Sequence, residues 1–160
     1  MIASYRQPFF NLATYVANVK NKPNEVLPIL DRMEQVVPRR IHPMDYRLKS
    51  DLASFYSMAG NMKEYRQLMS EIVEDVAPGL DTAPLEQLSQ YNPMVILLQA
   101  YETLGEYDKA LDVLQRIERA YGTTGGVKEF VSSKKMEMEM LKKNQKKRVD
   151  STSQKPSEKH

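Results

Sequence analysis

The feature that most constrains the fold is a pair of amphipathic helical stretches that recurs three times along the chain. Turns at Asn21, Gly60 and Gly105 each separate two stretches in which apolar residues recur every three or four positions, the spacing of one helix face. When the turns are aligned, apolar residues coincide at three positions of the second stretches: Val26, Tyr65 and Ala110; Leu30, Met69 and Leu114; and Met33, Ile72 and Ile117. One helix hairpin cannot bury both of its apolar faces, whereas stacked hairpins share a continuous core.

The ends of the helices are marked by residues that cap or interrupt them. Asp45, Asn61 and Asn92 each stand where a side-chain oxygen can accept hydrogen bonds from the amides of a first helical turn. Glu64 follows Asn61 at the spacing of a capping box, and Pro93 fits the first turn of a helix. These marks predict helices at about 2–19, 26–37, 45–59, 61–77, 92–104, 107–121 and 127–143.

The order of these helices predicts a single folded domain over residues 1–148. We expect an all-α fold, a right-handed superhelix of about three antiparallel helix hairpins, with a C-terminal capping helix after the third hairpin. Residues 149–160 form a polar stretch, which we expect to be a disordered tail.

The third helix pair resembles the tetratricopeptide repeat. It carries the run Leu97-Leu98-x-x-Tyr101-x-x-x-Gly105-x-Tyr107-x-x-Ala110-x-x-x-Leu114-x-x-Ile117, and the second pair keeps Leu52-Ala53-x-x-Tyr56-x-x-x-Gly60. The chain departs from the repeat at Leu98 and Ile117, where a small residue is usual, and at Tyr65, where the repeat has Ala. The resemblance implies stacked helix hairpins, joined here by longer connections than in a standard repeat of about 34 residues.

A narrower resemblance rests on the first helix pair and the start of the second. The run Leu30–Pro38 (LDRMEQVVP), followed by Pro43–Leu48 (PMDYRL), is similar to the C-terminal soluble region of a bacterial family of multi-spanning membrane proteins. That family is similar to protein O-mannosyltransferases and is described as a domain of unknown function. Asn92-Pro93 and the run Tyr101–Tyr107 fit the same region, so the resemblance covers about residues 5–140. It implies that any glycosyl transfer belongs to an absent membrane domain, and it places no catalytic residue on this chain.

Composition excludes several classes of site and partner. The chain has no Cys and two His, so disulfides are excluded and a transition-metal site would need carboxylates. A formal net charge of +2 is too small to indicate a nucleic-acid partner. No apolar run approaches the roughly 20 residues that span a bilayer, and the N-terminal sequence is not a signal peptide. We expect no metal, no cofactor and no nucleic acid. Attachment to the inner membrane is implied by the resemblance alone, and neither the cytoplasmic nor the periplasmic side is favoured.

The residues that most resemble catalytic groups have simpler structural interpretations. His42 and Asp45 lie in one loop, and Asp45 is better explained as the cap of the next helix than as a metal ligand. Glu71, with Glu74 and Asp75, forms a group of paired carboxylates, but the helix that carries them also needs a solvated face. No Ser lies in the Gly-x-Ser-x-Gly turn of an activated nucleophile. We therefore expect no catalytic residue.

The strongest candidate for a binding site is the concave side of the stack, which the first helix of each pair lines. Polar and mostly small side chains there suit hydrogen bonding to an extended peptide, although any solvated helix face can have a similar composition. Asn11 and Tyr15 are not the basic residues with which chaperone-type repeats clamp a peptide carboxylate, and this disfavours that class of partner. The predicted peptide-binding groove consists of Asn11, Tyr15, Asn18, Arg47, Ser50, Ser54, Ser57, Asn92, Gln99 and Glu102.

Two features of the last helix suggest weaker contacts. Met136, Met138 and Met140 could belong to a binding surface or to a soft core, and their two-residue spacing cannot place all three on one helix face. A basic run could make weak contacts with an anionic surface, or it could be a solvated helix end whose lysines suit the helix dipole. That run contains Lys142, Lys143, Lys146, Lys147 and Arg148.

Two function hypotheses follow, with a third that the sequence favours least. The first is a non-catalytic scaffold that binds a protein or peptide, or its own membrane domain, as the soluble C-terminal part of a membrane glycosyltransferase-like protein. The second is an independent peptide-binding adaptor or co-chaperone of the cytoplasm. The third is a stand-alone hydrolase or transferase, for which no set of reactive residues is present in the sequence.

Overall fold

We describe a computed structural model of the chain, which covers the backbone of residues 3–153 and the side chains of residues 5–147. This part of the chain consists of helices, turns and loops without a strand, so the all-α prediction is confirmed. Its internal contacts divide the chain into two compact units, Met1–Ala83 and Pro84–His160, whereas the sequence analysis groups residues 1–148 together. No helix within the described range is long and apolar enough to cross a membrane.

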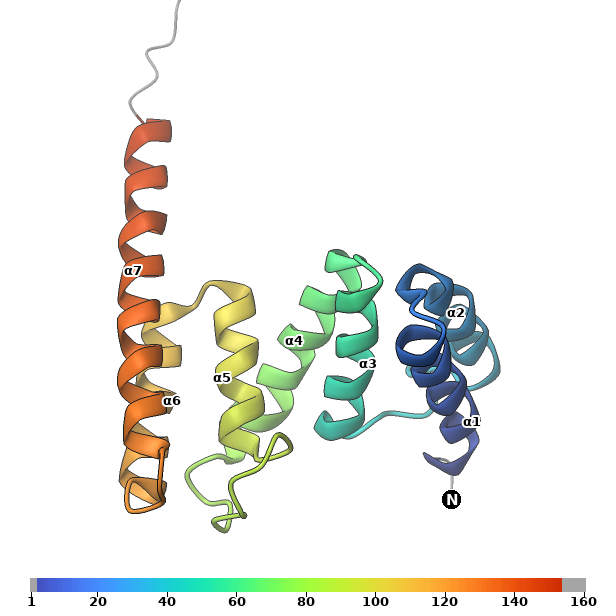
Figure 1. The fold of residues 1–160 in the computed structure, drawn as a ribbon, viewed down its shortest axis with the longest axis horizontal. Coiled ribbons are helices and arrows are strands. Elements are labelled where there is room, and N and C mark those ends of the chain that lie inside the picture. Colours follow the sequence, from blue (N-terminus) through green and yellow to red (C-terminus); the bar gives the residue numbers. More distant parts are fainter. Residues whose placement is uncertain (1–2, 154–160) are drawn as a thin grey trace, which may run out of the picture. The chain divides into compact units, whose positions relative to one another are not determined.

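The first unit contains two helix hairpins (Figure 1). In the first hairpin, α1 (Ala3–Thr14) continues through a π-helical turn, η1 (Tyr15–Val19), and a 3-10 turn, η2 (Pro23–Val26), leads into α2 (Leu27–Val36). In the second hairpin, α3 (Tyr46–Met58) is followed by α4 (Met62–Val76), which ends in the 3-10 turn η3 (Ala77–Gly79).

The caps of the first unit follow the sequence prediction with one difference. Asp45 caps α3, because its Oδ1 accepts hydrogen bonds from the backbone N–H groups of Arg47 (2.9 Å) and Leu48 (3.0 Å). Asn61 caps α4 by accepting from the N–H of Glu64 (3.3 Å). The return half of the expected capping box is not formed. The Asn61 N–H instead donates to the Tyr56 carbonyl (2.8 Å), and the Glu64 carboxylate pairs with Arg39 (3.3 Å).

The core of the first unit lies where the repeated apolar positions place it. Phe10 on α1 and Phe55 on α3 are in contact, with ring centroids 5.9 Å apart, so the first helices of the two hairpins are neighbours. Leu48, one helical turn before the buried Leu52 on α3, is only half-buried. The largest fully buried side chains of the two hairpins are Arg6, Leu30, Met33, Leu52, Leu68, Met69 and Ile72.

The second unit contains α5 (Pro93–Leu104), α6 (Tyr107–Tyr121) and α7 (Val127–Ser153), and α6 packs against both of the others. Asn92 caps α5 as predicted, accepting from the Met94 N–H (2.9 Å), and Pro93 occupies the first turn. Gly105 ends α5 with a φ of 77°, a left-handed conformation that favours glycine. The fully buried apolar side chains include Ile96, Leu97, Leu114, Ile117 and Met138.

The last helix is longer than the sequence analysis expects. α7 runs to Ser153, ten residues beyond the expected end at Lys143. No Gly or Pro interrupts the sequence between Val127 and Ser153, and its many Lys, Glu and Met residues favour helix. Residues 149–153, which the sequence analysis assigns to a disordered tail, therefore continue α7. The rest of that predicted tail, residues 154–160, lies outside the described residues.

Candidate functional site

The first unit presents an uncharged polar surface along two neighbouring helices. On α1 and its π turn, Asn11 and Asn18 are exposed. On α3, Ser54 and Ser57 are exposed, and Ser50 is half-buried. The Phe10–Phe55 contact brings α1 and α3 together at one point. We call the five residues Asn11, Asn18, Ser50, Ser54 and Ser57 the neutral polar face.

Helical spacing arranges the polar side chains of α3 in a row. On the first helix, Asn11 lies in α1 and Asn18 lies in the π-helical turn that follows it. On α3, Arg47, Ser50, Ser54 and Ser57 recur at steps of three, four and three and form one row. The first-unit residues of the predicted groove thus belong to α1, its π turn and α3.

Several of these side chains already make local contacts. The Gln7 side-chain amide donates to Asn11 Oδ1 (2.9 Å), and the Ser54 hydroxyl donates to the Ser50 carbonyl (3.0 Å). These bonds lie at the exposed surface, where a ligand can exchange for them at a small net cost.

The other two groove residues of the first unit, Tyr15 and Arg47, are an aromatic and a charged side chain. Tyr15 is half-exposed, and the Lys20 ammonium lies 5.6 Å from its ring centroid. The Arg47 guanidinium lies 5.1 Å from the ring centroid of Tyr46. Both residues therefore flank the neutral polar face with aromatic surface and a cation, groups that often anchor a bound peptide.

The groove residues predicted in the second unit have other environments. Asn92 is buried, with 1% of its surface exposed. Its Oδ1 accepts from Met94, and its Nδ2 donates to the Glu86 carbonyl (3.1 Å) and the Tyr121 hydroxyl (3.0 Å). The assignment of Asn92 to a binding surface is therefore wrong, because its carboxamide is already committed to the cap of α5. Glu102 pairs with Lys134 on α7 (3.2 Å), while Gln99 is exposed.

A buried arginine, which the sequence analysis overlooked, fixes the first hairpin. Arg6 on α1 is 1% exposed, and its Nη2 donates to the backbone carbonyls of Val37 (3.1 Å) and His42 (2.5 Å). Burial lowers the pKa of Arg6, although Glu34 acts in the opposite direction. The sequence carries a signal for this arrangement, since Arg6 lies four residues before Phe10 and so shares its buried side of α1.

Charged pairs connect the elements of the first unit. Arg39 joins α2 to α4 through Glu34 (3.1 Å) and Glu64 (3.3 Å). Lys49 on α3 pairs with Glu71 (3.4 Å) and Asp75 (2.7 Å) on α4. Two of the three carboxylates weighed as acid–base candidates therefore hold the second hairpin together. Among the described residues, no group of three or more His, Asp or Glu side chains could hold a metal ion.

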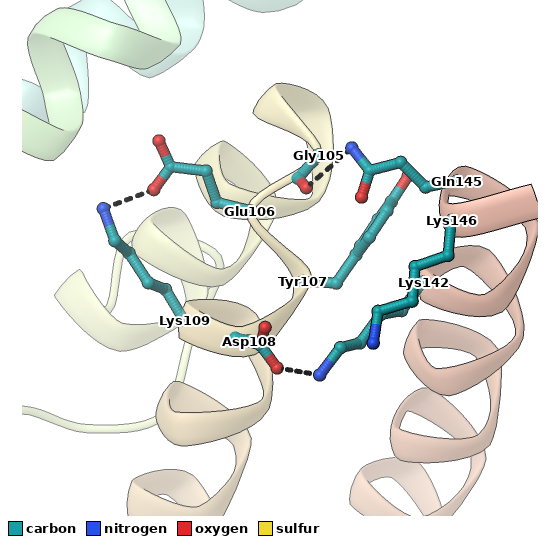
Figure 2. Close-up of a pocket in the computed structure, with 8 residues that line it drawn as sticks. All are labelled: Gly105, Glu106, Tyr107, Asp108, Lys109, Lys142, Gln145 and Lys146. Carbon is teal, nitrogen blue, oxygen red and sulfur yellow. Dashed lines mark hydrogen bonds and ion pairs between the residues drawn. The ribbon is translucent and has the colours of Figure 1, made fainter. Parts of the chain in front are cut away.

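A pocket of about 280 Å³ lies in the second unit, where the turn between α5 and α6 faces α7 (Figure 2). Lys142 forms an ion pair with Asp108, Lys109 pairs with Glu106 (2.6 Å), and the Gln145 side-chain amide donates to the Gly105 carbonyl (3.4 Å). Figure 2 shows Tyr107 between these groups. Both carboxylates of the pocket are thus paired with lysines, and Lys146 adds a third positive charge to its lining.

The structure also separates the features predicted on the last helix. Met138 is buried, whereas Met136 and Met140 are 61% and 62% exposed, so the three do not share a face, as the spacing predicts. In the basic run, Lys142 is paired, and Lys143, Lys146 and Lys147 are exposed. The side chain of Arg148 lies outside the described part of the chain.

No protein-family model, no curated protein and no solved structure matches the chain.

Proposed function

We propose that this chain is a non-catalytic helical-repeat scaffold whose first unit binds an extended peptide along the neutral polar face. The observation that carries the proposal is the contact between Phe10 and Phe55. That contact brings the two helices together at one point, and both helices expose uncharged hydrogen-bonding side chains. An extended peptide has unpaired backbone N–H and C=O groups at regular intervals, which amide and hydroxyl side chains can satisfy.

The proposal includes the arrangement and setting expected from the sequence. The three helix pairs stack in series as a right-handed superhelix with α7 as its cap, which the repeated apolar positions of the three pairs support. The chain is the soluble C-terminal part of a membrane glycosyltransferase-like protein, which is supported by the runs Leu30–Pro38 and Pro43–Leu48. Hydrophobic spanning segments upstream of this chain in its genomic reading frame would test the setting.

A displayed library of random peptides tests the binding site itself. Peptides selected on the intact chain should bind at least about tenfold more weakly to the Tyr15→Ala, Arg47→Ala double variant, because both anchors of the face are lost. Helix content, measured by far-UV circular dichroism, should stay unchanged, because both side chains are exposed.

A matched control comes from α2. The Arg32→Ala, Gln35→Ala double variant also removes two exposed side chains, which bond to each other (3.2 Å), and it should bind the selected peptides normally. Failure to enrich any peptide, or equal loss of binding in both double variants, would reject the neutral polar face as the site.

A further inference from the structure

α7 exposes a row of side chains in which two methionines are followed by two lysines. The row consists of Met136, Met140, Lys143 and Lys147, at steps of four, three and four. Because α7 is an unbroken α-helix, this spacing places the four side chains on one side of it. The methionines are 61% and 62% exposed, both lysines are exposed, and the buried Met138 marks the opposite side. We call these four residues the outer row of α7.

Positive charge gathers in the second half of α7. Residues 127–139 contain three Lys and three Glu, whereas residues 140–147 contain four Lys and no Asp or Glu. One of the four, Lys142, forms an ion pair with Asp108. The other three pair with no carboxylate among the described side chains. This part of α7 therefore presents lysines whose charge no described neighbour balances.

The same part of α7 lacks the buried residues that attach the first half to the unit. Val131 and Met138 are fully buried, but no described side chain between residues 139 and 147 is buried. Figure 1 shows α7 continuing past the turn between α5 and α6. A helical segment without packing is marginally stable in water, so a second surface that covers this segment would stabilise it.

The composition of the outer row indicates the chemistry of that second surface. Its lysines favour an anionic surface, and its exposed methionines favour an apolar one. The interface of an anionic bilayer supplies both, because apolar side chains enter the boundary between headgroups and acyl chains while lysines extend to the lipid phosphates.

Other anionic partners fit the outer row less well. A nucleic-acid backbone would pair with the lysines and would leave the two methionines in water. A helix-binding groove of a protein takes apolar residues from successive turns of one helix face, whereas the outer row becomes basic after Met140. The change from apolar to basic along one row therefore favours the lipid surface.

We infer that the outer row of α7 binds the surface of an anionic lipid bilayer. In this contact α7 lies along the surface, with Met136 and Met140 among the headgroups and with Lys143 and Lys147 beside lipid phosphates. The contact uses no residue of the neutral polar face, so it does not rest on the proposed peptide site and either idea can fail alone.

Vesicle sedimentation with the intact chain tests the role of charge. The wild-type chain should bind vesicles made of equal parts of phosphatidylcholine and phosphatidylglycerol, and should bind vesicles of phosphatidylcholine alone far more weakly. The Lys143→Gln, Lys147→Gln double variant should bind the anionic vesicles about 25-fold more weakly. Each lysine near an anionic membrane contributes about 1 kcal/mol, which is about fivefold in affinity.

A matched control removes the same charge elsewhere. Lys63 on α4 and Lys128 at the start of α7 are both exposed. The Lys63→Gln, Lys128→Gln double variant has the same net charge as the outer-row variant, and it should bind nearly as tightly as wild type. Equal losses in the two double variants would overturn the inference, because they would mean that only the net charge of the chain matters. A wild-type chain that binds no anionic vesicle would also overturn it.

Methionine substitutions separate a lipid surface from other anionic partners. The Met136→Gln, Met140→Gln double variant keeps the charge and should bind anionic vesicles about tenfold more weakly, because apolar contact with the bilayer is lost. The control is Met58→Gln, Met62→Gln, which replaces methionines that are 43% and 46% exposed and should leave binding unchanged. Normal vesicle binding by the outer-row methionine variant would reject the lipid surface. Duplex DNA bound by wild type as tightly as anionic vesicles would reject it too, in favour of a general contact with polyanions.

Discussion

The first and last helices of the chain, α1 and α7, are attached to their units in different ways. α1 is held by buried groups, among them the fully buried Arg6, which bonds to the carbonyls of Val37 and His42. α7 combines a buried apolar row, including Val131 and Met138, with ion pairs that remain partly exposed. The comparison shows that polar contacts contribute unequally to the free energy of unfolding. Removing the buried Arg6 leaves desolvated carbonyls without donors, which is costly. Removing one partner of an exposed ion pair costs little, because water solvates the other.

The largest effect should come from removing the anchor of α1. Arg6→Ala should lower the free energy of unfolding of the first unit by about 3–4 kcal/mol, because it removes the donor from a buried and a partly buried carbonyl and creates a cavity. Urea unfolding followed by circular dichroism, with hydrogen exchange of the α1 amides, would measure this loss. Gln7→Ala, on the exposed side of the same turn, should change stability by less than about 0.5 kcal/mol. A loss of unfolding free energy below about 1 kcal/mol for Arg6→Ala would mean that the buried bonds of Arg6 contribute no more than an exposed ion pair.

The next effect should come from the apolar row of α7. Met138→Ala should destabilise the second unit by about 2–3 kcal/mol, because it empties a fully buried site. Met136→Ala, two residues earlier and 61% exposed, is the matched control and should have little effect. The same urea titration measures both variants, and similar losses from the two would mean that α7 is not seated on the side that contains Met138.

A smaller effect should come from the ion pairs of α7. Lys134→Ala removes the pairs with Glu102 (3.2 Å) and Glu137 (3.0 Å), and should cost less than about 1 kcal/mol, because the three side chains remain partly exposed. Raising the salt concentration should weaken this contribution and leave that of Arg6 nearly unchanged. A salt-sensitive Arg6→Ala effect would contradict the distinction between the two helices.

The smallest effect should be a pH dependence of the same surface pairs. The hydrogen bond from Lys135 lowers the pKa of Glu118 below its ordinary value of 4.5. A carboxylate with a depressed folded pKa contributes stability above its unfolded pKa and loses it as the pH falls through the folded pKa. The melting temperatures of wild type and Lys135→Ala should therefore differ slightly near neutral pH and converge as the pH falls through the lowered folded pKa of Glu118. A difference in melting temperature that persists in acid would mean that Lys135 does not act through the Glu118 carboxylate.

The sequence predicted the helices well because their signals are local. Asp45 and Asn92 were identified as caps from spacing alone, and both accept the expected backbone hydrogen bonds. The length of α7 was underestimated because no Gly or Pro lies between the expected end at Lys143 and Ser153. The return half of the capping box failed because Glu64 has a competing partner, Arg39, 25 residues away in sequence. Pattern reasoning cannot find such a partner.

The candidate site was harder to predict than the helices. The row of Ser50, Ser54 and Ser57 follows from spacing, and its place beside α1 depends on one aromatic contact, Phe10 with Phe55, which no local pattern contains. Asn92 was assigned both to a cap and to the groove, and the structure keeps only the first role. Arg6 was overlooked because a charged residue is seldom expected on the buried side of a helix. Here its burial is possible because two backbone carbonyls accept hydrogen bonds from its guanidinium.

The alternation of methionines on α7 has a chemical consequence. Oxidants convert exposed methionine to the polar sulfoxide, and they reach buried methionine only when the fold opens. Met136 and Met140 lie in solvent on either side of the sheltered Met138. A mild oxidant should therefore add oxygen to the outer side of α7 while the thioether in the core stays reduced. Sulfoxide at position 138, detected by mass spectrometry, would thus report unfolding rather than surface damage.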